Sequence, residues 1–582
     1  MSAGGPADEL PELPVRRHGA AALAAVAAGP CTVVIGATGS GKTTQLPQLL
    51  LDAGLAGPRG VLGVTQPRRV AAVAVARRVA QERGGAVGGE VGYAVRFEER
   101  VSAGTRIKYM TDGMLLREAR EDPLLRRYRV LVLDEAHERS LNTDLLFGLL
   151  KDVALNRTAA RGPAGPLKLV VTSATLEGEK FAAYFGDCPL LSIPGRTFPV
   201  DVKHATEAPA PNRVVDAAVA TVLDLHEASP PGDVLCFFAG QGEIERACRL
   251  LEEGVAAMPA GAPGALVLPL FAAQAPEHQA RVFAPAPAGD GYTRRIVCAT
   301  NVAETSLTVP GVVYVVDPGF VKQKQFNPAT NMDSLEVVRI SRVQAVQRAG
   351  RAGRTQPGQC FRLYPKATFE EQMPAVTPPE ILRTSLEAAV LHLKSLPVSS
   401  QLDVLNFDFL DRPPVEQLAA ALKQLHVMGA LDADGRITET GQRMAGLPLD
   451  PALARALIEA VALRCVPEMT VVAAMLSVDS VFQAQAGGRR GAFEALEALE
   501  EEGMGDHVLY LRLFDLWRRN QVSEQGEPRR ERSLAPVEEV ACQLLERLAR
   551  PERRRRLTRR APAAPASSTP RSWRSSGSRG GG

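Results

Sequence analysis

The residues best suited to chemistry form a glycine-rich loop near the N-terminus. The run Gly36-Ala37-Thr38-Gly39-Ser40-Gly41-Lys42-Thr43 has P-loop spacing, and it follows an apolar segment and precedes an expected helix over residues 44–51. In this pattern backbone N–H groups surround the β-phosphate, the lysine reaches the β- and γ-phosphates, and the next hydroxyl binds Mg²⁺. A glycine-rich turn that serves only as a loop is the alternative. The flanking segments favour a P-loop, with Lys42 as phosphate ligand and Thr43 as metal ligand.

A pair of carboxylates follows another apolar segment. Residues 131–133 lead directly into Asp134-Glu135-Ala136-His137. A P-loop needs a second carboxylate at the end of a neighbouring strand, so we expect Asp134 to hold Mg²⁺ through its water shell. Glu135 would then polarise the attacking water as general base. Acidic residues that cap a surface helix are the alternative, which the nearby P-loop disfavours. Lys42, Asp134 and Glu135 together predict nucleotide hydrolysis.

An arginine-rich segment lies far downstream, over residues 347–354. It carries three arginines in eight residues, on an expected helix. Arg351 and Arg354 are three positions apart, so they would share a helix face and be able to reach one γ-phosphate. On these residues alone, a solvated basic helix face is the favoured interpretation.

Two series of short apolar segments are available to position these residues. Such segments, separated by helical stretches, are typical of buried parallel strands. The first series comprises residues 32–35, 61–65, 130–133 and 169–172, and the second comprises residues 234–238, 266–270, 295–299, 312–316 and 360–363. After Tyr364 the pattern becomes helical. The sequence therefore predicts two successive α/β units, each the size of a nucleotide-binding domain, and a mostly helical C-terminal third.

Composition narrows the class of protein. The chain has 582 residues, too many for one core, and 45% hydrophobic with 23% charged residues is ordinary for a folded soluble protein. The net charge of +3 conceals an asymmetry, because residues 551–582 hold nine arginines and one glutamate, which leaves −5 on residues 1–550. Nucleic acid would therefore have to bind in a local groove. The eight cysteines form no CxxC pair, which favours reduced thiols, and no apolar run approaches the roughly 20 residues of a membrane span.

Seven motifs occur in a fixed order along the chain. They occupy residues 36–44, 65–72, 111–115, 134–137, 173–175, 299–308 and 347–354. This series resembles the DEAH-box RNA helicases of superfamily two, over roughly residues 13 to 550. The resemblance implies an α/β fold of two tandem RecA-like domains, followed by a mostly α winged-helix and ratchet-like region. The expected domains are a disordered N-terminus (1–12), RecA-like domains at 13–200 and 201–376, a winged helix at 377–445, a ratchet-like bundle at 446–550 and a disordered basic tail at 551–582.

The resemblance also implies roles for particular residues. Gln347 would help to position the lytic water, and Arg351 and Arg354 would act as arginine fingers. Arg78 and Phe283 would clamp the adenine, and an ordinary core aromatic is the less favoured alternative for Phe283. His137, Ser173 and Thr175 would link the nucleotide to the domain interface. The full nucleotide-binding set is Gly36, Ala37, Thr38, Gly39, Ser40, Gly41, Lys42, Thr43, Thr44, Arg78, Phe283 and Ser306.

RNA contacts are implied on both α/β units. They fall on Arg68, Arg69, Arg96, Thr111, Thr300 and Asn301, side chains that suit sugar-phosphate oxygens. Ordinary surface charge is the alternative for the three arginines. Residues 317–340 resemble the long β-hairpin that separates strands in this family.

Some positions depart from the family pattern. Ala37 stands where glutamate is usual and Pro310 where an acidic ribose contact is common, so we expect altered nucleotide affinity and retained hydrolysis. No OB-fold is found after the ratchet-like region, where the sequence runs into Arg553-Arg554-Arg555-Arg556.

The resulting hypothesis is an ATP-dependent RNA helicase that uses ATP and Mg²⁺ and steps 3′ to 5′ along single-stranded RNA to remodel RNA or RNP. An RNA-binding ATPase clamp without unwinding activity is the alternative, and a DNA helicase or a motor on another polymer is a third hypothesis. We expect a monomer without membrane contact, with a glycine-patch activator in doubt because its usual docking domain is not found. Residues 477–481 and 340–344 favour ribosome biogenesis, and the basic tail suits the nucleus or nucleolus, with the cytoplasm left open.

Overall fold

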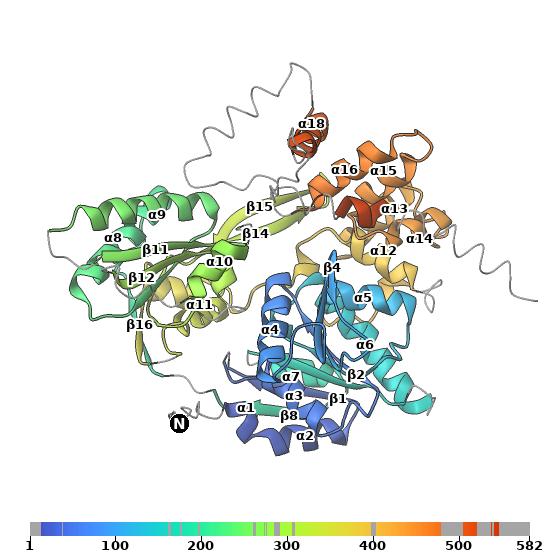
Figure 1. The fold of residues 1–582 in the computed structure, drawn as a ribbon, viewed down its shortest axis with the longest axis horizontal. Coiled ribbons are helices and arrows are strands. Elements are labelled where there is room, and N and C mark those ends of the chain that lie inside the picture. Colours follow the sequence, from blue (N-terminus) through green and yellow to red (C-terminus); the bar gives the residue numbers. More distant parts are fainter. Residues whose placement is uncertain are drawn as a thin grey trace, which may run out of the picture.

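The computed structural model describes residues 13–37, 39–160, 165–174, 177–195, 198–259, 264–272, 274, 276–284, 292–304, 309–354, 356–396, 403–478, 505–520, 537 and 540–545. Two α/β domains come first along the chain, and a mostly helical module follows them (Figure 1). We call these domain 1 (residues 14–193), domain 2 (residues 200–362) and the C-terminal module (residues 363–545). The architecture confirms the fold class predicted from the sequence.

Domain 1 is built on an eight-stranded sheet with the strand order β4-β3-β5-β2-β6-β7-β1-β8. All neighbouring strands are parallel except the β3–β4 pair. The strands are β1 (Cys31–Gly36), β2 (Val61–Gln66), β3 (Val91–Val95), β4 (Glu98–Arg100), β5 (Ile107–Thr111), β6 (Tyr128–Leu133), β7 (Lys168–Ser173) and β8 (Leu190–Ile193). Because the sheet is parallel, the carboxyl ends of β1, β2, β6 and β7 meet at one edge.

Helices cover both faces of this sheet, so its central strands are apolar on both sides. Val34 and Val170 belong to the core under one set of helices, whereas Val33 and Val171 belong to the core on the other face. The helices are α1 (Pro14–Arg17), α2 (Gly19–Ala28), α3 (Gln45–Asp52), α4 (Arg69–Glu82), α5 (Asp112–Glu121), α6 (Leu141–Ala160) and α7 (Gly178–Tyr184), with a short 3₁₀ turn η1 (Ala136–Glu138).

Domain 2 repeats the arrangement on a six-stranded parallel sheet with the order β11-β12-β10-β13-β16-β9. A separate antiparallel hairpin, β14–β15, leaves this domain towards the C-terminal module (Figure 1). The strands are β9 (Val200–His204), β10 (Asp233–Phe237), β11 (Gly264–Leu270), β12 (Tyr292–Ala299), β13 (Val312–Asp317), β14 (Phe320–Asn327), β15 (Met332–Arg339) and β16 (Gly358–Arg362). The helical elements are η2 (Pro211–Arg213), α8 (Val214–Ala228), α9 (Gln241–Ala256), α10 (Pro276–Phe283), η3 (Asn301–Ala303) and α11 (Arg342–Ala349).

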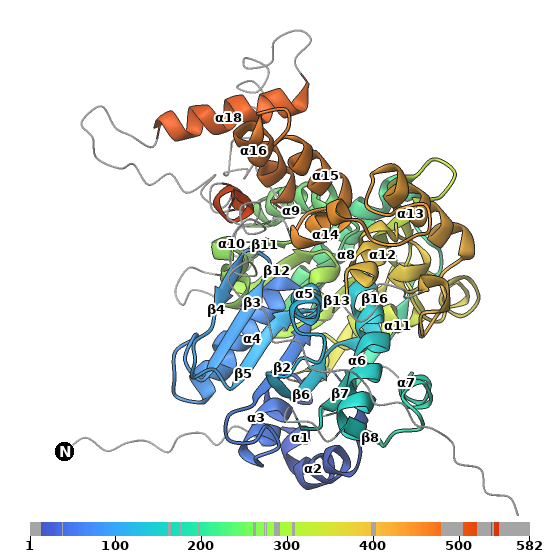
Figure 2. The same ribbon diagram turned by 90° about the vertical axis from the view of Figure 1, so that its right-hand side faces the viewer.

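The C-terminal module shares a hydrophobic core with domain 1. The Phe407 ring lies against Gly148 of α6, and Ile381 and Leu386 belong to the same cluster as the buried residues of α6. Its elements are η4 (Thr368–Gln372), η5 (Glu380–Leu382), α12 (Glu387–Ser395), η7 (Val404–Asn406), α13 (Val415–Val427), α14 (Glu439–Gly446), α15 (Pro451–Glu459), α16 (Val466–Ser477) and α18 (Asp506–Asn520). Figure 2 shows these helices stacked above domain 1. In the part of the chain that the structure describes, no helix is both long and apolar enough to cross a bilayer.

Every strand predicted from the sequence is present, but β3, β4, β5, β8 and β9 were not predicted. β4 is short and β8 and β9 are sheet edges with exposed residues, so their sequences carry little apolar pattern. β5 is buried, yet Lys108 interrupts its apolar run. Glu99 and Glu118 neutralise this lysine at 3.0 and 2.6 Å, an arrangement that only tertiary structure provides.

Candidate active site

The P-loop follows β1 and precedes α3, as predicted. Gly39 and Gly41 have φ values of +87° and +93°, which side chains rarely adopt, so the tight loop depends on glycine at both positions. Two contacts hold the loop from outside: the Val15 N–H donates to the Ser40 carbonyl at 3.0 Å, and the Tyr109 hydroxyl donates to the Thr43 carbonyl at 2.9 Å. α3 begins at Gln45, so Thr44 immediately precedes it; Thr38 lies outside the described residues.

Lys42 lies inside this loop and is almost fully buried. Its ammonium donates to the Gly36 carbonyl and, at 3.1 Å, to the Ala37 carbonyl. Burial lowers the pKa of Lys42, while the charges of Glu135 and Asp134 oppose that shift. A buried cation held by neutral carbonyls is one that a phosphate group would stabilise.

Asp134 occupies the end of β6, at the edge where the P-loop also lies. Gln66 at the end of β2 donates to its Oδ2 at 2.6 Å, and the Thr172 hydroxyl of β7 donates to its Oδ1. Both carboxylate oxygens therefore have a fixed orientation. The two neighbouring strands supply these donors, which follows from the order β2-β6-β7.

Glu135 follows in a left-handed conformation, with φ 53° and ψ 37°. Burial, followed by the charge of Asp134, raises the pKa of Glu135 to about 8, and the Lys42 ammonium acts in the opposite direction. Its Oε2 is buried and has no hydrogen-bond partner among the described residues. A carboxyl group with a raised pKa and an unengaged oxygen suits a general base.

His137 lies 3.5 Å from Glu135, measured from Nδ1 to Oε2. Burial lowers the pKa of His137 to about 4, so the ring is neutral near pH 7, and its Nδ1 accepts a hydrogen bond from the Ala174 N–H at 3.3 Å. The two side chains therefore do not form an ion pair. The contact joins His137 to Ala174, which directly follows β7, and the last residue of β7, Ser173, is buried. Thr175 lies outside the described residues.

Arg351 and Arg354 of domain 2 interact electrostatically with the P-loop lysine and with Glu135. Burial lowers the pKa of Arg354 to about 10, and the charge of Glu135 acts against that shift; Arg354 in turn contributes to lowering the pKa of Lys42. The charge of Arg351 acts to lower the pKa of Glu135. The two domains are therefore coupled electrostatically through these arginines, Lys42 and Glu135.

The predicted helix over residues 347–354 is wrong in extent. α11 ends at Ala349, and Arg351 and Arg354 lie in the turn that follows, so they do not share a helix face. The segment after α11 packs closely against residues before β9: the Phe198 N–H donates to the Gly353 carbonyl at 2.9 Å, and a Cβ at Gly353 would lie 2.6 Å from the Phe198 carbonyl oxygen. The third arginine, Arg348, is fully buried between Glu304 and Asp317 at 3.1 and 2.8 Å.

ATP and Mg²⁺ fit the residues that are present. The loop is tight because Gly39 and Gly41 adopt left-handed conformations. Lys42 is buried and donates to main-chain carbonyls, and no carboxylate lies at salt-bridge distance from it in the described part of the chain. The Gln347 amide, like Glu135 Oε2, is a buried polar group without a hydrogen-bond partner among the described residues. Thr43 and Asp134 offer the oxygen ligands that Mg²⁺ requires.

The two expected adenine contacts lie on different domains. Arg78 is exposed on α4 and donates to Glu82 at 2.7 Å. Phe283 ends α10 and is half-buried against the domain 2 core, which is compatible with the core-aromatic interpretation. No ring or hydrogen-bond contact between the two is found within the described residues, and Ser306 lies outside them.

The expected RNA ligands are partly engaged within the protein. Arg68 donates to Glu138 at 3.2 Å and, across the domain boundary, to the Asn301 carbonyl at 3.0 Å. Arg96 donates to the Pro448 carbonyl of the C-terminal module at 3.1 Å. Arg69 is exposed at the start of α4, Thr111 precedes α5, and Thr300 precedes η3. The sequence did not indicate that Arg68 and Arg96 join different domains.

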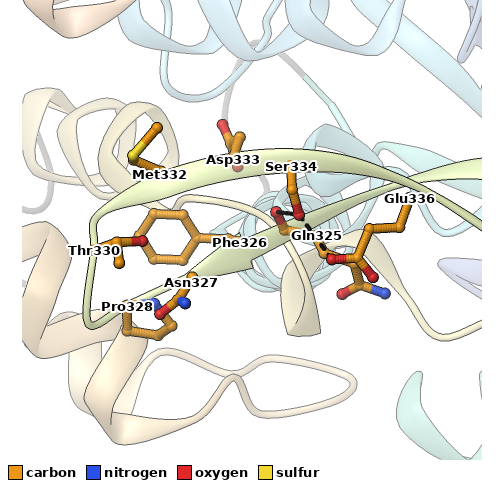
Figure 3. A pocket seen from close by; sticks show the side chains of 9 residues that line it. All are labelled: Gln325, Phe326, Asn327, Pro328, Thr330, Met332, Asp333, Ser334 and Glu336. Carbon is orange, nitrogen blue, oxygen red and sulfur yellow. Dashed lines mark hydrogen bonds between the residues drawn. The ribbon is translucent and has the colours of Figure 1, made fainter.

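The hairpin expected over residues 317–340 is present as β14–β15. Its tip is tied to the C-terminal module, because the Phe326 N–H donates to the Arg383 carbonyl at 2.9 Å and Arg383 donates to the Lys324 carbonyl at 3.1 Å. A hollow of about 490 Å³ at the tip is lined by hairpin residues, including Phe326 and Met332 (Figure 3). None of its lining residues belongs to the nucleotide site.

Sequence reasoning missed several residues that support the site. Gln66 orients Asp134, Tyr109 holds the P-loop, and Arg139 joins the acidic segment to the C-terminal module. Gln66 lies within the motif over residues 65–72, and this motif was the one sequence signal that could have pointed to it. Tyr109 and Arg139 carried none, because their partners are distant in the sequence or unremarkable in type.

A P-loop and an acidic pair from one RecA-like domain, together with arginines from a second, define a nucleoside-triphosphate site shared between two domains. Residues 16–183 match the DEAD/DEAH box helicase family and residues 217–356 match the helicase conserved C-terminal domain. Residues 421–449 and 450–510 match the winged-helix and ratchet-like parts of the helicase associated domain (HA2). The chain belongs to the DEAH/RHA group of superfamily-two helicases.

Two relatives illustrate this similarity. The chain is 44% identical over 518 residues to the pre-mRNA-splicing factor ATP-dependent RNA helicase prp22 of Schizosaccharomyces pombe, an alignment that covers 88% of this chain and 42% of that protein. The crystal structure of the Escherichia coli DEAH/RHA helicase HrpB matches with a TM-score of 0.75 and 32% identity, covering 92% of this chain and 60% of that one. The chain thus spans less than two thirds of the length of either relative.

Proposed function

We propose that the chain is an ATP-dependent RNA helicase, in which ATP hydrolysis between the two RecA-like domains drives translocation on single-stranded RNA and remodelling of RNA or RNP. The observation that carries this proposal is the shared site itself. The charge of Glu135 in domain 1 acts on the pKa of Arg354 in domain 2, and the charge of Arg354 contributes to lowering the pKa of Lys42. Membership in the helicase family supports the same function.

The arrangement suggests how each residue acts. Lys42 would bind the β- and γ-phosphates, and Thr43 and Asp134 would hold Mg²⁺, which neutralises phosphate charge when bound. Glu135 would accept a proton from a water that Gln347 helps to position. Arg351 and Arg354 would stabilise the charge that develops on the γ-phosphate. Because these arginines belong to domain 2, hydrolysis would depend on the position of that domain.

Similarity to the S. pombe relative supports a more specific proposal for the substrate and the cellular process. The name of the S. pombe protein includes pre-mRNA splicing and RNA helicase activity. We therefore propose single-stranded RNA as the polymer and nuclear RNA processing as the process. That name favours splicing over the ribosome-biogenesis expectation from the sequence. The monomeric state and a glycine-patch activator stay predictions.

The proposal is tested by ATP turnover with and without RNA. We expect RNA to stimulate turnover by the wild-type chain and Lys42→Ala to abolish it. Lys366→Ala is the matched control, because Lys366 is exposed and its nearest acidic partner, Glu370, lies outside the site. DNA of the same sequence should stimulate poorly, and a duplex with a single-stranded 3′ extension should be unwound. Equal, RNA-independent turnover by wild type and Lys42→Ala would exclude the proposal, and RNA-stimulated turnover without unwinding would favour the clamp.

A further inference from the structure

The turn that carries the general base has an uncommon backbone. Glu135 and Arg139 both have left-handed φ values, +53° and +49°, and they flank the 3₁₀ turn Ala136–Glu138. A left-handed conformation at a residue other than glycine costs on the order of 1–3 kcal/mol, so surrounding contacts must hold it. The contacts of Glu138 and Arg139 show where that support comes from.

Glu138 connects the turn to domain 2. Its Oε2 accepts from Arg68 Nε at 3.2 Å, and Arg68 Nη1 donates to the Asn301 carbonyl at 3.0 Å. Asn301 begins η3, directly after β12 of domain 2. The Arg68 guanidinium therefore bridges the turn of domain 1 and the first residue of η3.

Arg139 connects the same turn to the C-terminal module. Its guanidinium makes two hydrogen bonds to Asp144, at 2.7 and 2.9 Å, and one to Asp411 at 2.6 Å. The Arg139 carbonyl also accepts from the Glu380 N–H at 3.1 Å. The Arg139 side chain is buried, so these are strong, charge-assisted contacts.

We propose that Glu138 and Arg139 are positioning residues, which hold Glu135 in its working orientation when domain 2 and the C-terminal module are docked against the turn. This inference rests on the proposed function, in which Glu135 is the general base. Arg68 then acts chiefly through Glu138, in place of the RNA-ligand role expected from the sequence. A shift of about 1 Å at a catalytic group can cost about 10²-fold in rate, so loss of either connection should reduce turnover.

The test uses the full chain with Arg68→Ala and Asp411→Ala. Each has a matched control that breaks an ion pair elsewhere. Arg83→Ala removes an arginine of similar exposure, 19% against 27%, whose partners Asp52 and Glu90 lie within domain 1. Asp408→Ala removes the exposed 2.7 Å pair with Lys151, which crosses the same boundary as Asp411 without touching the turn.

We expect kcat at saturating RNA to fall about 10- to 100-fold in both test variants, with the KM for ATP changed less than about twofold. Both controls should keep wild-type kcat. Arg68→Ala combined with Glu138→Ala should lose no more than either alone, because the two side chains act as one connection. Arg68→Lys should recover part of the loss. A purely structural defect would lower the melting temperature and change kcat and KM together.

Three results would overturn the inference. The first is wild-type kcat in both test variants. The second is a loss of RNA affinity with a reduced salt dependence at unchanged kcat, since Arg68 would then bind an RNA phosphate. The third is an equal loss in the controls. An inactive wild-type chain would contradict the proposed function instead. If Arg68→Ala lowers the melting temperature, Glu138→Gln replaces it as the test variant, because it preserves side-chain size. The same fall in kcat is expected for Glu138→Gln.

Discussion

Replacing Arg348 by methionine separates a structural from a catalytic role within one arginine-rich segment. Arg348 is fully buried, and it pairs with Glu304 at 3.1 Å and Asp317 at 2.8 Å and donates to the Phe320 carbonyl at 3.1 Å. Removal of the guanidinium leaves two buried carboxylates without a countercharge, which typically costs about 3–5 kcal/mol. At about 2–4 °C per kcal/mol for a domain of this size, the melting temperature of domain 2 should fall by about 10 °C.

The assay compares thermal unfolding and ATP turnover of Arg348→Met with those of Arg354→Met. Arg354→Met should melt like the wild type and lose about 10³-fold in kcat, as expected for an arginine finger. Adding Glu304→Gln and Asp317→Asn to Arg348→Met should restore part of the lost stability, because the uncompensated charges are then removed. Melting of Arg348→Met at the wild-type temperature would refute the buried-charge argument. Loss of turnover without a change in melting would mean that Arg348 is itself a ligand.

Three further predictions concern packing and protonation. Gly195→Ala would place a Cβ 2.4 Å from the Ala37 Cβ, so the KM for ATP should rise about tenfold, and Ala37→Gly in the same chain should restore it. Gly148→Val would force a Cβ to within 2.6 Å of the Phe407 ring, so the melting temperature should fall by an amount equivalent to about 1–3 kcal/mol. His137 stays neutral in the fold with its pKa lowered to about 4, from 6.5, so the unfolded chain gains a proton first as the pH falls below 6.5. Urea unfolding should therefore show about 2 kcal/mol less stability at pH 5 than at pH 7 from this residue, a loss that His137→Gln avoids.

The parts of the fold that the sequence predicted are those whose pattern is local. β1, β2, β6 and β7 each contain a short apolar run that is buried, because helices cover both faces of the sheet. β5 escaped prediction because Lys108 is buried only with the help of Glu99 and Glu118. A charged residue in a central strand becomes intelligible only when its partners, distant in sequence, are known.

The same distinction applies to the site. The P-loop and the acidic pair are each continuous in sequence, and their strand contexts could be read directly. Gln66 and Tyr109 could not be assigned, since their partners Asp134 and Thr43 are 68 and 66 residues away. Helical periodicity did not reveal that α11 ends at Ala349, which leaves Arg351 and Arg354 in a turn where Gly353 packs closely against Phe198.

The contacts of the acidic segment also decide which part of the chain can be expected to work as a unit. Domain 1 contains Lys42, Asp134 and Glu135, yet the arginines that would stabilise the developing charge belong to domain 2. Buried residues of α6 in domain 1 share one hydrophobic core with residues of the C-terminal module such as Ile381 and Phe407. Excision of domain 1 would therefore expose that apolar surface to water. Excision would also remove Asp411, and with it one of the two connections that hold the turn. Residual nucleotide binding without efficient turnover is therefore the behaviour that the geometry assigns to domain 1 alone, because binding needs the P-loop whereas hydrolysis needs all three parts.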